Sequence, residues 1–254
     1  MKKIFLAIIA LLISSHSFAS LPENDLWKQD NKFMSNITEA EFYAVIDEMR
    51  QLYSPIIRGF GGWFVLSGNW DDSTVNAYAS RSGAEYHVNM FGGLARRPEV
   101  TLDGFRMVIC HEIGHHLAGF PNSGWASYEG QSDYYATHVC ARKVLSKYSA
   151  DETDIPHFCK NIKDEDDQKT CARTLKAGLS LANLLAALND EPTPSYETFD
   201  PTQVRTTQQS HPAAQCRLDT YLAGAVCEKP WNDRVIPRNA KASCDNRPRC
   251  WYAP

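Results

Sequence analysis

The sequence lacks the features of several protein classes. It has no stretch rich in lysine and arginine, and its formal net charge is −4, which argues against nucleic-acid binding by phosphate neutralisation. It has no internal repeat and no low-complexity segment. Its eight cysteines include no C-x-x-C pair, the usual spacing of a zinc knuckle. What remains is a globular composition, 43% hydrophobic and 22% charged over 254 residues, able to bury one core.

The first 19 residues have the organisation of a signal peptide. Lys2 and Lys3 form a positively charged start, and residues 4–13 are an apolar run of ten. Ser17 and Ala19 place small residues at the two positions that a signal peptidase reads. The alternative is a short membrane anchor, but a spanning helix needs roughly 20 apolar residues. No cysteine stands directly after the apolar run, where a lipoprotein would need one. We therefore predict export to the periplasm or the medium.

The cysteine content agrees with export. All eight cysteines follow the predicted signal peptide, and an even number in an oxidising compartment indicates up to four disulfides. Proximity in sequence favours two pairs, Cys216–Cys227 and Cys244–Cys250. The other four would pair among themselves in an order that the sequence leaves open: Cys110, Cys140, Cys159 and Cys171.

The pattern of the remaining chain predicts one α+β domain. Thr38 and Glu41 have the spacing of a capping box, so a helix should run from there to about Tyr53. Residues 59–90 are predicted to be β-structure, with short strands at 63–66, 75–79 and 86–90. Later helices are expected at 102–119, 125–146 and 168–188.

Three segments are expected along the chain: the signal peptide, residues 1–19, a domain, residues 20–230, and a cysteine-containing C-terminal tail, residues 231–254. Residues 190–210 are rich in proline and threonine and are predicted to be a loop. The tail shows little periodicity, so its shape should depend on its cysteines.

The strongest chemical signal is an H-E-x-x-H sequence formed by His111, Glu112 and His115. Residues four apart share one face of a helix, so both imidazoles can point at one Zn²⁺, and the glutamate can reach the water that zinc activates. His116 points roughly 100° away and is expected either to support the metal ligands or to be structural. The alternative is a histidine-rich surface helix, but the neighbours are apolar and favour a buried face: Met107, Val108, Ile109 and Leu117.

A catalytic zinc usually has a third protein ligand. A metzincin would need Gly at 118 and His at 121, where this chain has Ala118 and Pro121. Glu129, fourteen residues after His115, would complete a His₂Glu set from the next helix. Asp133 lies one turn further on and could accept the second ring N–H of a ligand histidine. A pair of solvated helix charges is the alternative for these two carboxylates.

The HExxH sequence followed by the E-x-x-x-D of Glu129 and Asp133 resembles the gluzincin metallopeptidases. Flanking motifs narrow the resemblance to the group that contains the CAAX prenyl endopeptidases and the HtpX-type stress proteases. These motifs are an Asn-Ala-aromatic strand at 75–79, an edge strand and turn at 86–94, and Ser210-His211-Pro212 followed by Arg217. The resemblance covers about residues 75–220, and the cysteines and the tail are not part of the shared core.

The resemblance implies a minigluzincin-like zincin core with a small sheet, an active-site helix, a glutamate-ligand helix and, here, a disulfide-pinned C-terminal region. It also implies that His211 stabilises the oxyanion, that Arg217 supports it, and that Asn76 contacts the substrate backbone. A helix-starting His-Pro and ordinary surface polar groups are the alternatives for these residues.

An extended substrate is expected to add to the strand at 86–90, binding along Tyr86, His87 and Val88. Such binding uses main-chain hydrogen bonds and therefore favours unfolded or flexible polypeptide. No other partner is indicated, neither nucleic acid nor a membrane segment after signal cleavage.

The sequence thus predicts an exported zinc metalloendopeptidase with one Zn²⁺ per chain, held by His111, His115 and Glu129, and with Glu112 as general base. Two alternatives stay open. One is a zinc hydrolase acting on cell-wall peptide or amide bonds, and the other is a non-catalytic binding module that retains the metal site.

Overall fold

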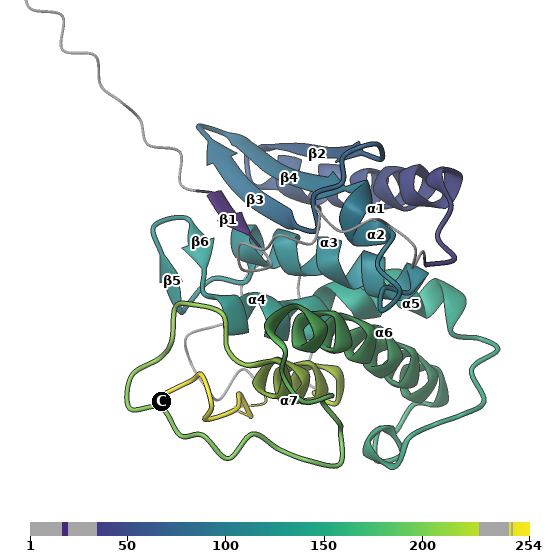
Figure 1. Ribbon diagram of the computed structural model, residues 1–254, viewed down its shortest axis with the longest axis vertical. Coiled ribbons are helices and arrows are strands. Elements are labelled where there is room, and N and C mark those ends of the chain that lie inside the picture. Colours follow the sequence, from purple (N-terminus) through teal and green to yellow (C-terminus); the bar gives the residue numbers. More distant parts are fainter. Residues whose placement is uncertain (1–16, 20–34, 229–243, 245) are drawn as a thin grey trace, which may run out of the picture.

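The computed structural model describes residues 17–19, 35–228, 244 and 246–254. Most of the predicted signal peptide and of the predicted tail therefore lies outside the described residues. The described chain has two layers, a small β-sheet above and a group of helices below (Figure 1). The expected α+β class is confirmed.

The first helix, α1 (Glu39–Gly59), begins at the predicted capping box. The Thr38 hydroxyl accepts a hydrogen bond from the Glu41 backbone N–H, and the Glu41 carboxylate accepts one from the Thr38 backbone N–H. Phe42, Ile46 and Met49 are buried on its inner face. The helix continues beyond the expected end at Tyr53 because Ile57 is also buried in the core, and Pro55 is accommodated within it.

Replacing Thr38 by alanine is expected to lower the free energy of unfolding by about 1 kcal/mol, since one N-terminal N–H loses its side-chain acceptor. Denaturant unfolding measures the change. Thr193→Ala, in an exposed loop position, is the control and should change it by less than about 0.5 kcal/mol. A Thr38→Ala variant as stable as the control would contradict the cap.

The sheet has the strand order β1-β3-β4-β2, built from β1 (Ser17–Ala19), β2 (Trp63–Asn69), β3 (Ala77–Ser82) and β4 (Glu85–Phe91). β3 and β4 form an antiparallel hairpin whose turn uses Gly83 at a positive φ of 55°. β2 runs parallel to β4. Alternate β4 residues, Tyr86, Val88 and Met90, are buried toward the helices.

The expectation that residues 86–90 form an edge strand is wrong. β4 is paired along its whole length with β3 on one side and with β2 on the other. The outer strands of the sheet are β2 and the short β1, which pairs with residues 78–80 on the other side of β3. A short helix, α2 (Gly92–Ala95), follows β4.

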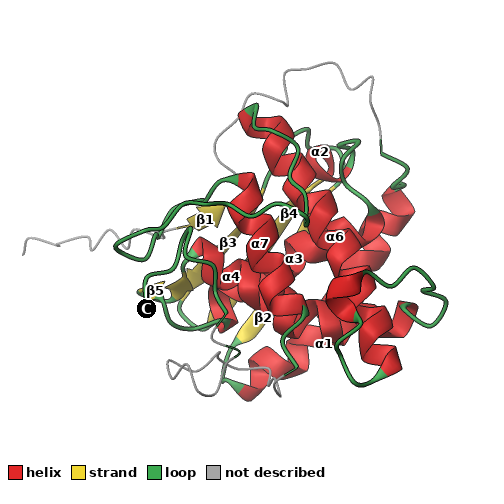
Figure 2. Ribbon diagram, turned by 90° about the horizontal axis from the view of Figure 1, so that it is seen from below, coloured by secondary structure: helices red, strands yellow, loops and turns green. Residues whose placement is uncertain are grey.

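Helix α3 (Leu102–Leu117) lies at the centre of the molecule. Thr101 caps it through the Gly104 backbone N–H, and every residue from 104 to 117 is buried. One side of α3 contacts the sheet, and the other contacts α4 (Glu129–Tyr135) and α6 (Glu165–Asn189). Figure 2 shows α4, α6 and α7 (Ala214–Ala225) gathered around α3, with the strands behind them.

The segment after α3 differs from the predicted helix at 125–146. Residues 122–127 form a hairpin of β5 (Asn122–Ser123) and β6 (Ala126–Ser127), turning at Gly124 with φ of 59°. The helix begins four residues later than expected, at Glu129. It then continues through the π-helical η2 (Ala136–Ala141), α5 (Arg142–Leu145) and the 3₁₀ turn η3 (Ser146–Tyr148).

The later part of the fold contains the predicted helix and loop, and also α7 (Ala214–Ala225), which was not predicted from the sequence. Helix α6 covers the expected 168–188, is capped by Asp164 and is preceded by the 3₁₀ turn η4 (His157–Cys159). Residues 191–213 contain no helix or strand. Among the described helices, none combines the length and the apolar character needed to cross a membrane.

Four disulfides are present, and both pairs favoured by sequence proximity are wrong. The bonds are Cys110–Cys140, Cys159–Cys171, Cys216–Cys250 and Cys227–Cys244. Cys216 is near the start of α7 and Cys227 lies just past its end. Eleven residues of helix separate two Cα atoms by roughly 16 Å, whereas a disulfide needs less than about 7 Å. Each cysteine therefore bonds to the C-terminal region instead.

Candidate metal centre

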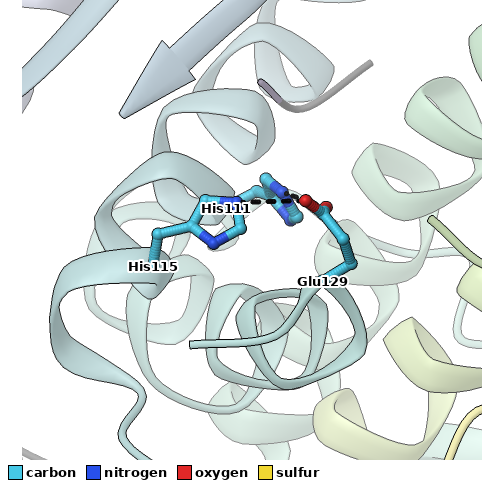
Figure 3. A group of neighbouring side chains, drawn as sticks. All are labelled: His111, His115 and Glu129. Atoms are coloured by element: carbon cyan, nitrogen blue, oxygen red, sulfur yellow. Dashed lines mark ion pairs between the residues drawn. The ribbon is translucent and has the colours of Figure 1, made fainter. Parts of the chain in front are cut away.

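His111, His115 and Glu129 come together in the interior, all three buried. Their ligand atoms lie within 4.8 Å of one another. Nε2 of His111 is 3.2 Å from one carboxylate oxygen of Glu129, and Nε2 of His115 is 3.6 Å from the other. Figure 3 shows both imidazoles turned toward the carboxylate, so the group could hold a metal ion.

Two helices set this geometry. The histidines are one turn apart on α3, with ring centroids 4.8 Å apart and ring planes at 86°. Glu129 is the first residue of α4, which crosses close to α3 at Gly114. A Cβ added at Gly114 would lie 2.9 Å from the backbone of Ser132, so the two helices can approach this closely only with glycine there. The glycine inside the HExxH sequence thus brings the third ligand near.

The outward-facing nitrogen of each imidazole is already used. Nδ1 of His111 donates to Oδ1 of Asp133 at 2.7 Å, and Nδ1 of His115 donates to the backbone carbonyl of Ser127 at 2.9 Å. When the ring is neutral and its proton is on Nδ1, Nε2 presents a lone pair toward Glu129. This is the tautomer that a metal ligand needs.

The facing atoms also fit a cation. Nε2 of His111 and Oε2 of Glu129 are buried, and neither forms a hydrogen bond within the described residues. These two atoms lie 3.2 Å apart in the interior, where the negative charge of the carboxylate needs a proton on His111 or a bound cation to offset it. Two imidazole nitrogens and a carboxylate are a donor set that suits Zn²⁺.

Asp133 is held by a buried ion pair with Arg217. The guanidinium Nε donates to Oδ2 and Nη2 to Oδ1, both at 2.7 Å, and both side chains are fully buried. Burial raises the pKa of the Asp133 carboxyl, but the charge of Arg217 outweighs it and holds that pKa well below its usual range. Burial likewise lowers the pKa of His111, yet the ionised Asp133 raises it to about 9.

His211 also reaches the cluster. Its Nε2 is 3.5 Å from Oε1 of Glu129, and its side chain is 27% exposed while Glu129 is 4% exposed. Residues 211–213 lie in the loop that enters α7. His211 therefore stands where the buried group meets the solvent. Glu112, next to His111 on α3, is fully buried.

The four residues expected to bind substrate have different surroundings in the structure. Asn76 precedes β3, and its side-chain oxygen Oδ1 accepts a hydrogen bond from the Ala77 backbone N–H. Val88 is in the core, Tyr86 packs against His116, and His87 forms an ion pair with Glu85. Because both edges of β4 are paired, substrate cannot add a strand along these three β4 residues.

His116 has the structural place expected of it. Its Nε2 donates to the backbone carbonyl of His87 on β4 at 3.0 Å, and its ring stacks on Trp125 at 4.9 Å. Burial lowers its pKa to about 3, so the ring is neutral. His116 thus joins α3 to the sheet.

The sequence did not indicate Ser127 as the partner of His115, because a backbone carbonyl carries no residue-type signal. Nor did it indicate that Trp251, near the C-terminus, packs on Gly130, the residue after Glu129.

Comparison with protein families, with curated proteins and with solved structures finds no match for this chain.

Proposed function

We propose that this protein is an exported zinc metalloendopeptidase that hydrolyses extended or unfolded polypeptide. The observation that carries the proposal is the buried group of His111, His115 and Glu129, with both Nε2 lone pairs turned inward and Glu112 one residue from the first ligand. Support for export comes from the predicted signal peptide and from four disulfides, which persist in oxidising compartments.

Each residue has a distinct task in this proposal. A zinc ion in the site supplies Lewis-acid activation of water. Glu112 takes the proton of the attacking water and delivers it to the leaving nitrogen. His211, at the solvent side of Glu129, donates to the oxyanion that forms at the scissile carbonyl. Asp133 and Arg217 hold the His111 ring in place.

In this proposal the substrate pairs with β3 rather than with β4, because both sides of β4 are already paired. The outer edge of β3 accepts an antiparallel strand, since Ser17–Ala19 pairs with residues 78–80 there. β3 contacts α3, which carries the histidines. Signal cleavage after Ala19 would remove that strand and leave the edge open to an extended peptide, which would bind by main-chain hydrogen bonds. In this proposal Asn76, at the entrance to β3, contacts the backbone of the bound peptide.

Metal content is the first test. The oxidised protein without residues 1–19 should contain about one zinc per chain, and Glu129→Ala should lose it to a chelator that the wild type withstands, because one of three ligands is gone. Mass spectrometry measures both. Glu99→Ala, which breaks an ion pair with Arg97 outside the site, is the control and should keep its zinc.

The other outcomes separate the alternatives. A folded wild type without zinc would favour a binding module, and zinc unchanged in Glu129→Ala would mean that the third ligand is another residue. Casein and a muropeptide serve as paired substrates for the zinc-loaded protein. Hydrolysis of the muropeptide alone would replace the peptidase proposal by a cell-wall amide hydrolase.

A further inference from the structure

Residues 246–253, here called the C-terminal strap, contact three elements that bring polar side chains to the metal centre from outside α3. These elements are α4 with Glu129, the loop that leads to His211, and α7 with Arg217. Cys250 and Trp251 are almost completely buried. The strap is thus part of the core, although the sequence predicts an unpatterned tail.

The strap fixes the beginning of α4. The indole of Trp251 lies directly on Gly130, so that a Cβ at this position would overlap the ring. Gln131 is held from both sides, because its amide donates to the Ala118 carbonyl at the end of α3 and its carbonyl accepts from Arg247, each at 3.0 Å. The Tyr134 hydroxyl donates to the Asn246 side chain at 3.0 Å.

These contacts matter because α4 has a weak start of its own. Its N-cap, Tyr128, makes no side-chain capping hydrogen bond, and Glu129 is the first helical residue. The first turn of a helix has unpaired N–H groups and frays easily. Without the strap, the position of the Glu129 carboxylate would depend on the uncapped end of the helix that begins at this residue.

The same strap holds the His211 loop and α7. The backbone N–H groups of Val204 and Gln208 donate to the carbonyls of Arg249 and Trp251, at 2.9 and 2.8 Å. Gln208 lies three residues before His211. The Cys216–Cys250 disulfide joins the strap to α7 beside Arg217.

We propose that the C-terminal strap positions Glu129 and His211 at the metal centre, so that zinc affinity depends on Trp251 and on the Cys216–Cys250 bond. The inference rests on the proposed function. Trp251 and Cys250 act as positioning residues, since they touch the helix that carries the ligand and not the reacting atoms. Partners of this kind typically change metal affinity by about 10- to 100-fold.

Zinc affinity in two variants tests the proposal, by competition with a chelator. Trp251→Ala and the double variant Cys216→Ser/Cys250→Ser should each bind zinc about 10- to 100-fold more weakly than the wild type. Trp251→Phe should recover part of the loss, since a smaller ring can still cover Gly130. The visible spectrum of the Co²⁺-loaded protein should show an altered ligand geometry in the first two.

Cys159→Ser/Cys171→Ser is the matched control. It also removes one disulfide, but one that lies in a separate hydrophobic cluster with Ile162 and Leu175. Its zinc affinity should equal that of the wild type. An equal loss in both double variants would show general destabilisation and would overturn the positioning role.

Hydrogen exchange of the metal-free proteins provides a readout that does not depend on zinc. Trp251→Ala should speed amide exchange in residues 129–135 and 204–211 but not in 165–189, while the control should leave 129–135 unchanged. Unchanged exchange at 129–135 in Trp251→Ala would overturn the strap. If Trp251→Ala exchanges faster at 129–135 and the wild type binds no zinc, the role of the strap would be supported and only the proposed function would be rejected.

Discussion

Glu112→Gln is expected to retain zinc and to lose hydrolysis of casein by about 10²- to 10⁴-fold. Glutamine has the shape of glutamate and can fill the same buried space beside His111, but its amide cannot take a proton from the attacking water. Glu112 is not in the ligand group, so the affinity for the metal should change little. Initial rates and metal content, measured on the same preparation, test both halves of the prediction.

The control is Glu48→Gln, which alters a carboxylate paired with Arg106 away from the metal centre. It should keep both zinc and activity. Substantial hydrolysis by a zinc-loaded Glu112→Gln would reject Glu112 as the general base. Loss of zinc in that variant would instead make Glu112 part of the metal's environment.

Arg217→Met is expected to lower the free energy of unfolding of the metal-free protein by about 3–5 kcal/mol. Arg217 and Asp133 are both fully buried and joined by two hydrogen bonds of 2.7 Å. Without the guanidinium, the ionised carboxylate remains in the interior with His111 as its partner, and most of the compensation for its desolvation is lost. Denaturant unfolding with chelator present measures the change without a contribution from metal binding.

Arg205→Met, at an exposed loop position, is the control and should change stability by less than about 0.5 kcal/mol. The double variant Arg217→Met/Asp133→Asn should lose less than the sum of the two single variants, because the two side chains act on each other. An Arg217→Met variant as stable as the control would show that Arg217 does not compensate the buried charge of Asp133.

Local patterns predicted much of the fold. The capping box at Thr38 and the glycine-punctuated strands depend on interactions within a few residues, and these appear near the expected positions. The spacing of His111 and His115 determines a shared helix face, because it depends only on the pitch of a helix. Asp133 was reached by the same argument, as one turn beyond Glu129.

Two of the failed predictions concern segments that are distant in the chain. Cys216 and Cys227 lie at opposite ends of α7, and the strand at 86–90 is paired on both sides. In both cases the outcome depends on which distant segment packs alongside, and a short stretch of sequence does not carry that information. A third failure is local, because the hairpin at 122–127, which turns at Gly124, replaces the start of a predicted helix.

The sequence by itself determined the chemistry that this protein can offer: two histidines one turn apart, a glutamate between them and a carboxylate on the following helix. The tertiary structure alone decided which atoms meet. It directs Nδ1 of His111 to Asp133 and Nδ1 of His115 to the Ser127 carbonyl. It also brings His211 to Glu129 and places Trp251 on Gly130. Such contacts join residues far apart in the chain, and only the packing of helices and strap in three dimensions creates them.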